Sequence, residues 1–363
     1  MKPLSNIRIS VSHATHTSSN SNVFGSPSSF RGKSWLVGVI ALLGIAAACM
    51  LLPGPVRAGA PASRQPDAAT VARARAAFLK YMSSRRTLVR SAGFATPLAA
   101  GGGGATALPS VNWSGYADVE GGSKTISSVS GQWVIPYVQC PGGPYRYQDA
   151  FISNWVGIDG ATDNTVEQLG SAAQCFEGVT YYYVWYEMFP AGTVEEGTLD
   201  CINNNVDCPQ PGDYISASVT VKPAGATNNY TLSLTDFTRP RESFSVTASC
   251  DAATCLDSSA EWIVERPAFE LPFGFQILPL VDFSPTGFYH GTLTSGGKTT
   301  YIEKFRDGPV YDVDMSDDSS SYWLACVGQK SPGPQLLLTS DPNSCPIVSP
   351  HHGSFTATWD SSF

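Results

Sequence analysis

Short runs of β-branched and aromatic residues, bounded by proline and glycine, constrain this chain more than any other feature. A Pro–Gly cluster at 140–144 is one such boundary, and no long amphipathic helix interrupts the series. Runs of this kind predict strands joined by turns. We therefore expect an all-β fold, a two-sheet antiparallel β-sandwich of the concanavalin-like type. The runs are Val129–Ile135, Ala150–Ile158, Thr180–Phe189, Tyr214–Val221, Tyr230–Asp236, Ser243–Ala248 and Glu261–Val264.

The N-terminal region has the order of a secretory signal. An apolar run at Trp35–Leu52 follows Arg31 and Lys33 and precedes the small residues at 58–60. This order is typical of a signal peptide, here with a long n-region over residues 1–60. The run is also near the length of a membrane span, so an uncleaved anchor is the alternative. We expect a secreted, extracellular protein that has no membrane contact after processing.

Charge divides the chain into a basic and an acidic part. Residues 1–100 hold twelve of the 22 Lys and Arg residues and only one acid, Asp67, so the remainder carries 10 basic against 29 acidic groups, a net charge of −19. Such a balance argues against nucleic acid or anionic membrane as a partner. It favours an acidic working environment, where protonation relieves repulsion, although an acidic surface kept for solubility is the alternative.

The segment at 61–107 is expected to be a basic propeptide with a glycine linker. The stretch 68–89 is Ala-rich with helical spacing of apolar residues, and Gly101–Gly104 follows. A basic segment joined to an acidic domain at 108–363 suggests an inhibitor held by charge. A cationic tail with no inhibitory role is the alternative. The tail after about 300 has no assigned place in this scheme.

Cysteine usage agrees with export. Eight cysteines remain beyond the signal segment, an even number that allows four disulfides. Two pairs are close enough in sequence to close local loops, Cys201 with Cys208 and Cys250 with Cys255.

The motifs of several common catalytic and metal sites are absent from the sequence. Beyond the signal segment the histidines are His290, His351 and His352, and no HExxH or CxxC motif is present. We therefore expect no metal site and no cofactor. The chain has no GxSxG motif, and its exported cysteines are expected to be paired. If the protein is an enzyme, carboxylates and amides must carry the reaction.

The segment at 260–265, AEWIVE, concentrates such groups. Successive strand side chains alternate faces, so Glu261 and Glu265 share one face while Trp262 takes the other. Burial on an aromatic face raises the pKa of a carboxyl group, as acid–base catalysis in acid requires. The alternative is structural, with the tryptophan in the core and a glutamate paired, for example, with Arg266.

Several segments together resemble the glutamic peptidases, or eqolisins. The matching pieces occur in family order over roughly 112–290. They are NWSGY at 112–116, WVGIDG at 155–160, EQLG at 167–170, VWYEMFP at 184–190, PGDYI at 211–215 and AEWIVERP at 260–267, with a weaker match at 278–283.

The resemblance implies a sandwich of curved sheets with a substrate groove, made as an exported precursor whose basic propeptide inhibits it. It implies an endopeptidase that acts on polypeptides in acid, needs no metal and resists pepstatin. The catalytic pair of the family is one Gln and one Glu. Gln168 matches the Gln position, whereas Gln132 does not. Glu265 matches the Glu position, and Glu261, on the same face, is its rival.

Five further residues match groove or supporting positions of the family: Trp113, Trp155, Asp159, Trp185 and Glu187. The chain departs from the family where Tyr183 and the residues at 171–173 replace expected acids. These departures concern the hydrogen-bond support of the pair and the preferred pH.

Two other classes of function stay open from the residues themselves. A non-catalytic carbohydrate-binding sandwich would also place aromatic and acidic side chains on a sheet face. A glycoside hydrolase would use two carboxyl groups, such as Glu261 with Glu265 or Glu187. For each function we expect a monomer.

Overall fold

Strands account for nearly all of the regular structure. The computed structural model describes residues 10–11, 88–89, 106–122, 125–142, 149–196, 208–271, 274–316, 323–328 and 352–359. Helical structure within these residues consists of two single turns, η2 (Pro240–Glu242) and η3 (Ile302–Lys304). None of the described helices is long and apolar enough to cross a membrane. The all-β expectation is confirmed.

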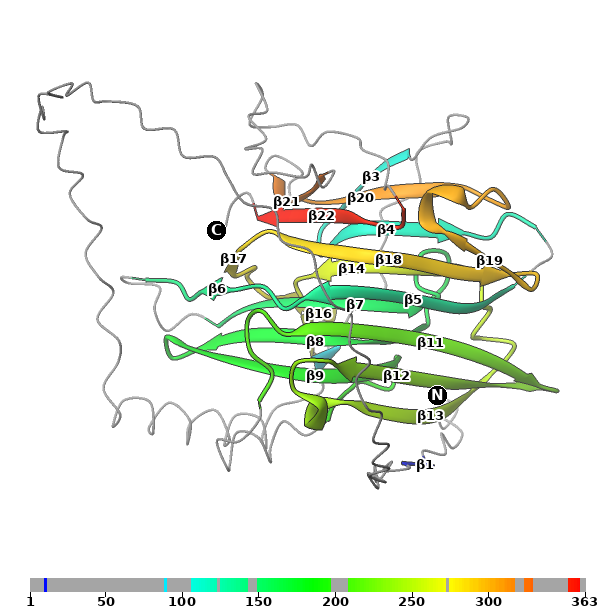
Figure 1. Ribbon diagram of the computed structural model, residues 1–363, viewed down its shortest axis with the longest axis horizontal. Coiled ribbons are helices and arrows are strands. Elements are labelled where there is room, and N and C mark those ends of the chain that lie inside the picture. The colour runs from blue at the N-terminus through cyan, green and yellow to red at the C-terminus, as the bar shows by residue number, and fades with distance from the viewer. Residues whose placement is uncertain are drawn as a thin grey trace, which may run out of the picture. The chain divides into compact units, whose positions relative to one another are not determined.

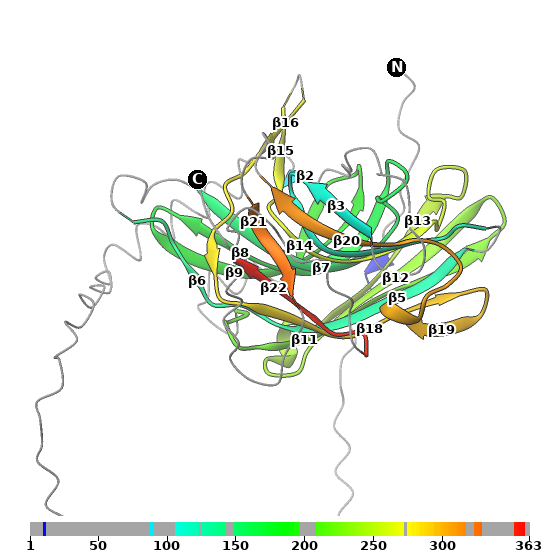
Figure 2. The ribbon, with the colours of Figure 1, turned by 90° about the horizontal axis from the view of Figure 1, so that it is seen from above.

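The strands form two packed layers that lie one above the other in Figure 2. The first layer is antiparallel except at its edge, where β3 (Thr106–Ser110) runs parallel to β20 (Val310–Ser316). In hydrogen-bonding order it contains β10 (Thr193–Glu196), β9 (Val179–Phe189), β8 (Val166–Phe176), β7 (Ala150–Ile158), β14 (Ser259–Glu265), β4 (Trp113–Val119) and β20 (Val310–Ser316).

The second layer is antiparallel and joins the first through two strands near the C-terminus (Figure 1). Its order is β13 (Phe244–Asp251), β12 (Thr227–Asp236), β11 (Tyr214–Ala224), β5 (Ile126–Val134) and β18 (Thr286–Ser295), with β19 (Lys298–Tyr301) beside β18. The strand β22 (Phe355–Trp359) pairs with β18 and with β21 (Trp323–Gly328), and β21 pairs with β20. The described part of the chain beyond residue 300 therefore contributes strands to both layers.

Short pairings complete the description. A small sheet contains β2 (Leu88–Val89), β15 (Ala268–Leu271) and β16 (Gly274–Ile277), and β6 (Val138–Gln139) pairs with β17 (Asp282–Phe283). In the region expected to be signal peptide, only β1 (Ser10–Val11), which pairs with β13, is described. The rest of that region lies outside the described residues, as does the expected helix at 68–89 apart from its last two residues, which form β2.

The core lies between the layers and follows from side-chain alternation. In β14, Trp262 and Val264 point into this core, and all seven residues of the strand are buried. The indole nitrogen of Trp262 donates to the carbonyl oxygen of Ser130 in the opposite layer, 2.8 Å away. The indole nitrogen of Trp133 likewise donates to Ser171 Oγ at 2.8 Å. Each large ring thus fills the core and still satisfies its N–H group.

All seven runs expected to be strands overlap observed strands. Disulfides join Cys250 to Cys255, as the spacing suggested, and Cys140 to Cys175. Cys208 is also disulfide-bonded, whereas Cys201 lies outside the described residues.

Gly170 of β8 provides a test of the packing. A Cβ atom at this position would clash with the carbonyl oxygen of Asn154 and lie 2.7 Å from Trp155 Cβ. We expect Gly170→Ala to lower the free energy of unfolding by about 1–3 kcal/mol, because the rigid neighbouring strand cannot yield. Chemical denaturation measures this loss. Gly142→Ala is the control, since nothing lies within 4 Å of its Cβ position; equal losses in both variants would contradict the packing described.

Candidate active site

One row of residues crosses the first layer and contains three of the polar groups singled out from the sequence. Glu261 on β14 lies opposite Gly157 on β7, which lies opposite Gln168 on β8, which lies opposite Glu187 on β9. Residues opposite one another across a sheet point to the same face. The row therefore brings Gln168 and the two glutamates to one face, and Glu265 joins that face four residues farther along β14.

Gln168 is held by its neighbour in the row. Its side chain is buried, and Nε2 donates to Glu187 Oε2 at 2.9 Å. Gln168 Oε1 has no hydrogen-bond partner among the described residues. An amide carries two N–H groups, so the bond to Glu187 orients the side chain and leaves a second donor.

Glu265 is held by two neutral donors. Trp155 Nε1 donates to its Oε2 at 2.7 Å, and Asn112 Nδ2 donates to its Oε1 at 3.4 Å. Glu265 is fully buried, so these bonds replace water around the carboxyl group. Asn112 belongs to the NWSGY motif, but the sequence suggested no role for it.

Trp155 lies between Glu265 and Gln168. Its Cζ3 atom is 2.9 Å from the place that a Cβ atom of Gly157 would occupy, so the ring lies over that glycine. Gly170 lies directly opposite Trp155 on the neighbouring strand and also lacks a side chain. Two glycines thus make room for one indole ring, whose nitrogen reaches Glu265.

The three tryptophans expected in the groove lie on this face within one apolar cluster. Trp113 meets Trp155 edge to face, with ring centroids 5.0 Å apart, and both pack with Trp185 and Ile263. Trp185 Nε1 donates to Ser153 Oγ at 3.1 Å. The cluster surrounds the buried carboxyl and amide groups with apolar surface.

Asp159 holds a loop rather than facing the row. It follows β7 with a positive φ of 67°, and its carboxyl oxygens accept the backbone N–H groups of Asp257 at 2.9 Å and Ser258 at 2.6 Å. Burial, with a further contribution from Asp163, raises the pKa of Asp159 to about 7, although the two backbone donors oppose the shift. Asp159 thereby fastens the loop that leads into β14.

Glu261 has different surroundings from Glu265. Burial raises its pKa well above the usual range, and the nearby Asp159, Asp163 and Asp118 raise it further, while Ser259 opposes the shift. The shift favours the neutral carboxylic acid form of Glu261.

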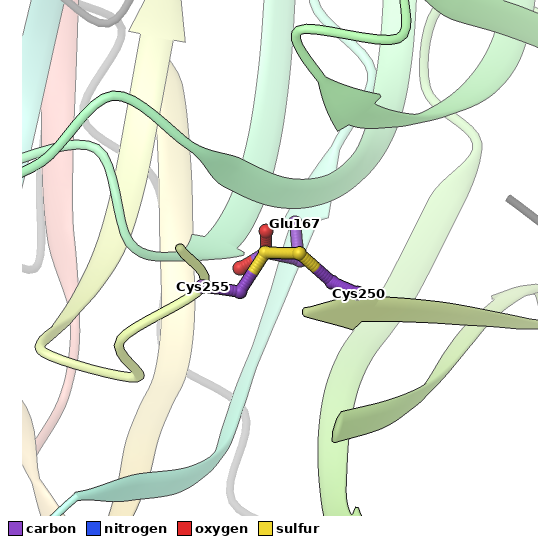
Figure 3. A group of neighbouring side chains, drawn as sticks. All are labelled: Glu167, Cys250 and Cys255. Carbon is purple, nitrogen blue, oxygen red and sulfur yellow. A yellow bond between two sulfur atoms is a disulfide. The ribbon is translucent and has the colours of Figure 1, made fainter. Parts of the chain in front are cut away.

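Sequence reasoning missed the carboxyl groups behind the row. Glu167, next to Gln168, points to the opposite face of β8 and is buried beside Asp159 and Asp257. Alternation within VEQLG was the available signal. Figure 3 shows Glu167 against Cys250 and Cys255, with ligand-type atoms all within 4.8 Å of one another. The two sulfur atoms form a disulfide, so they do not act as thiolate ligands for a metal.

One family model matches more than half of the chain. The model of the peptidase A4 family matches residues 111–321, whereas no curated protein matches the chain. Among solved structures, SCP-B, a member of the eqolisin family of peptidases in complex with the tripeptide Ala-Ile-His, is 18% identical with a TM-score of 0.46, covering 69% of this chain and 98% of its own. Aspergilloglutamic peptidase from Aspergillus niger is 24% identical with a TM-score of 0.40, covering 58% and 99%.

The indole bond to Glu265 generates a stability prediction. Trp155→Phe leaves a fully buried carboxyl oxygen of Glu265 without its 2.7 Å donor, and an unsatisfied buried acceptor costs about 1–3 kcal/mol. Trp185→Phe is the matched control, because it removes the same N–H group from a neutral hydroxyl, worth about 0.5–1.5 kcal/mol. Denaturant unfolding of both variants should give the larger loss for Trp155→Phe. The reverse order would contradict the role given to the Trp155–Glu265 bond.

Proposed function

Because the chain belongs to the peptidase A4 family, the glutamic endopeptidases, we propose that it hydrolyses polypeptides in acid with Glu265 and Gln168 as its catalytic pair. The observation that supports this assignment is the hydrogen bonding of Glu265. Two neutral N–H donors orient its oxygen atoms on the face that also holds Gln168. Glu261 shares that face, but burial and neighbouring acids shift its pKa upward, towards the neutral form.

The reaction is a direct attack by water. Glu265 takes a proton from a water molecule, and the resulting hydroxide forms a bond to the carbonyl carbon of the peptide. The second N–H group of Gln168 donates to the oxygen that becomes negative, while Glu187 keeps the amide in place. Glu265 then passes its proton to the leaving nitrogen as the C–N bond breaks, which yields an acid and an amine.

Neutral groups suit this chemistry at low pH. The amide of Gln168 and the indole of Trp155 do not titrate in the acid range, so their hydrogen bonds persist there. The aromatic cluster of Trp113, Trp155 and Trp185 supplies apolar walls for an extended peptide. No step requires a metal or a cofactor. Because the proposed pair is not the aspartate dyad of aspartic proteases, we expect pepstatin not to inhibit cleavage.

Export as a precursor is the second part of the proposal. Disulfides in the described domain support an oxidising, extracellular location. We assign residues 1–60 to a secretory signal and 61–107 to a basic inhibitory propeptide. The pairing of Leu88 with Phe269 and of Val89 with Ala268 supports the inhibitory role, because β15 begins three residues after Glu265. The basic segment and the acidic domain also attract each other.

The catalytic pair is tested by substitution. We expect Gln168→Ala to lower kcat by about 10²–10³-fold, as loss of one oxyanion donor does. Glu265→Gln should abolish cleavage of a denatured protein at acid pH with pepstatin present, because no base remains. Circular dichroism should show both variants folded. Gln132→Ala, on the half-buried face of the second layer, is the control and should retain activity. If Glu265→Gln stays active while Glu261→Gln does not, the assignment of the glutamate is wrong.

The precursor is tested by acid incubation. We expect the full chain to be weakly active, and to gain activity as it loses its N-terminal segment, because β2 is then removed from beside β15. N-terminal mapping of the product locates the cut, expected before the acidic domain that starts near residue 108. The Glu265→Gln precursor should stay intact under the same conditions. An uncut chain as active as the shortened one would rule out inhibition by this segment.

A further inference from the structure

Glu167 is a buried acid that the proposed mechanism does not use. It lies on the inner face of β8, directly behind Gln168, and opposite Ile158 on β7 and Met188 on β9. Its side chain is fully buried. Figure 3 shows its carboxyl group beside the disulfide that joins Cys250, at the end of β13, to Cys255 in the following loop. The adjacent residue on the other face is thus one of the proposed catalytic pair.

The groups that face Glu167 are acids and one phenol. They come from the loop after β7, the loop before β14 and strand β12: Asp159, Asp163, Asp257 and Tyr230. Burial, followed by Asp159, Asp163 and Asp257, raises the pKa of Glu167 well above its usual range. Burial also raises the pKa of Asp257 to about 6, although the Tyr230 hydroxyl, 2.6 Å away, opposes this. None of these neighbours offers a positive charge.

This cluster connects the two strands that carry the proposed catalytic pair. Asp159 accepts the backbone N–H groups of Asp257 and Ser258, which lead directly into β14 and Glu265. Asp257 accepts bonds from Tyr230 and, at 2.7 Å, from Asn228 Nδ2. Ionised carboxylates buried beside one another would repel one another. The loop before β14 would then separate from β8.

We propose that Glu167 is a positioning residue: as a neutral carboxyl group it keeps β8, and with it Gln168, packed against the loop that leads into β14, and its ionisation releases that contact. The inference rests on the proposed function, because it concerns the alignment of Gln168 with Glu265. Glu167, on the core side of β8, would then set the upper pH limit of the site that contains Gln168 on the other side of the strand.

The direction of the pH effect follows from proton linkage. Glu167 keeps its proton in the folded chain at a pH where it would lose it in the unfolded chain. The folded state then binds more protons, so the free energy of unfolding falls as pH rises. The fall begins near the usual glutamate value of about 4.3. It continues through the range in which Asp159, with a pKa of about 7, also ionises.

The test compares Glu167→Gln with the parent across pH. Glutamine keeps the size of the side chain, but it cannot ionise. Both proteins are compared within the pH range where tryptophan fluorescence reports an intact fold. As pH rises towards 7, the parent's kcat should fall. The kcat of the variant, relative to its value in acid, should stay about tenfold higher, which is the effect of one pKa unit. Glu177→Gln, at an exposed acid in the turn after β8, is the control and should follow the parent.

A second measurement separates this inference from the proposed function. Tryptophan fluorescence measures the pH at which half of the protein has unfolded. In chains that also carry Glu265→Gln, Glu167→Gln should still raise this pH midpoint, because no catalysis is involved. Glu167→Leu, which also cannot ionise, should behave in the same way. Unchanged kcat profiles and midpoints in both variants would overturn the proposal. So would equal shifts in Glu177→Gln, or failure of both Glu167 variants to fold at pH 4.

Discussion

Burial of both faces of the first layer is the constraint on which the rest of the structure depends. Every residue of β14 is buried, so neither of its glutamates has a solvated side of the sheet available. A carboxyl group in such a place must either remain protonated or accept hydrogen bonds that replace water. The pKa of Glu261 is raised by burial and by neighbouring acids, whereas Glu265 accepts hydrogen bonds from Asn112 and Trp155. One strand with a two-residue repeat therefore presents two acids with different surroundings on a single face.

The hydrogen-bond donors described on this face are neutral. Asn112 and Trp155 donate to Glu265, and Gln168 donates to Glu187, whereas an ion pair between Arg239 and Asp213 lies in the second layer. An ion pair in the site would weaken in acid as its carboxylate took up a proton, but amide and indole donors do not change charge. At neutral pH the acids on the core side of β8 would be destabilised on ionisation, because the neighbours that act on Glu167 are themselves acids. A working range in acid is thus consistent with the donors on one face and the carboxyl cluster on the other.

Much of the fold could be predicted from the sequence. The runs around residues 129–264 predicted strands because alternation and turn residues are local signals, and the two-layer fold followed from them. Residues such as 166–176 were not predicted as a strand, although β8 carries Gln168. Ala, Ser, Gly and Gln give this segment little β propensity. Its conformation is determined instead by pairing with β7 on one side and with β9 on the other. The strands β20 and β22 were missed because their partners are distant in sequence.

The sequence by itself determined which residues share a face, since the two-residue repeat of a strand allows no other arrangement. It placed Glu261 with Glu265, and the motifs pointed to Gln168 as a partner. Only the tertiary structure decided what surrounds each acid: Trp155 and Asn112 at Glu265, and Asp159, Asp257 and a disulfide at Glu167. Those neighbours come from strands and loops far apart in the chain. Because burial and neighbouring charge govern protonation, the chemical state of each glutamate is a property of the packed sheets rather than of the strand that carries it.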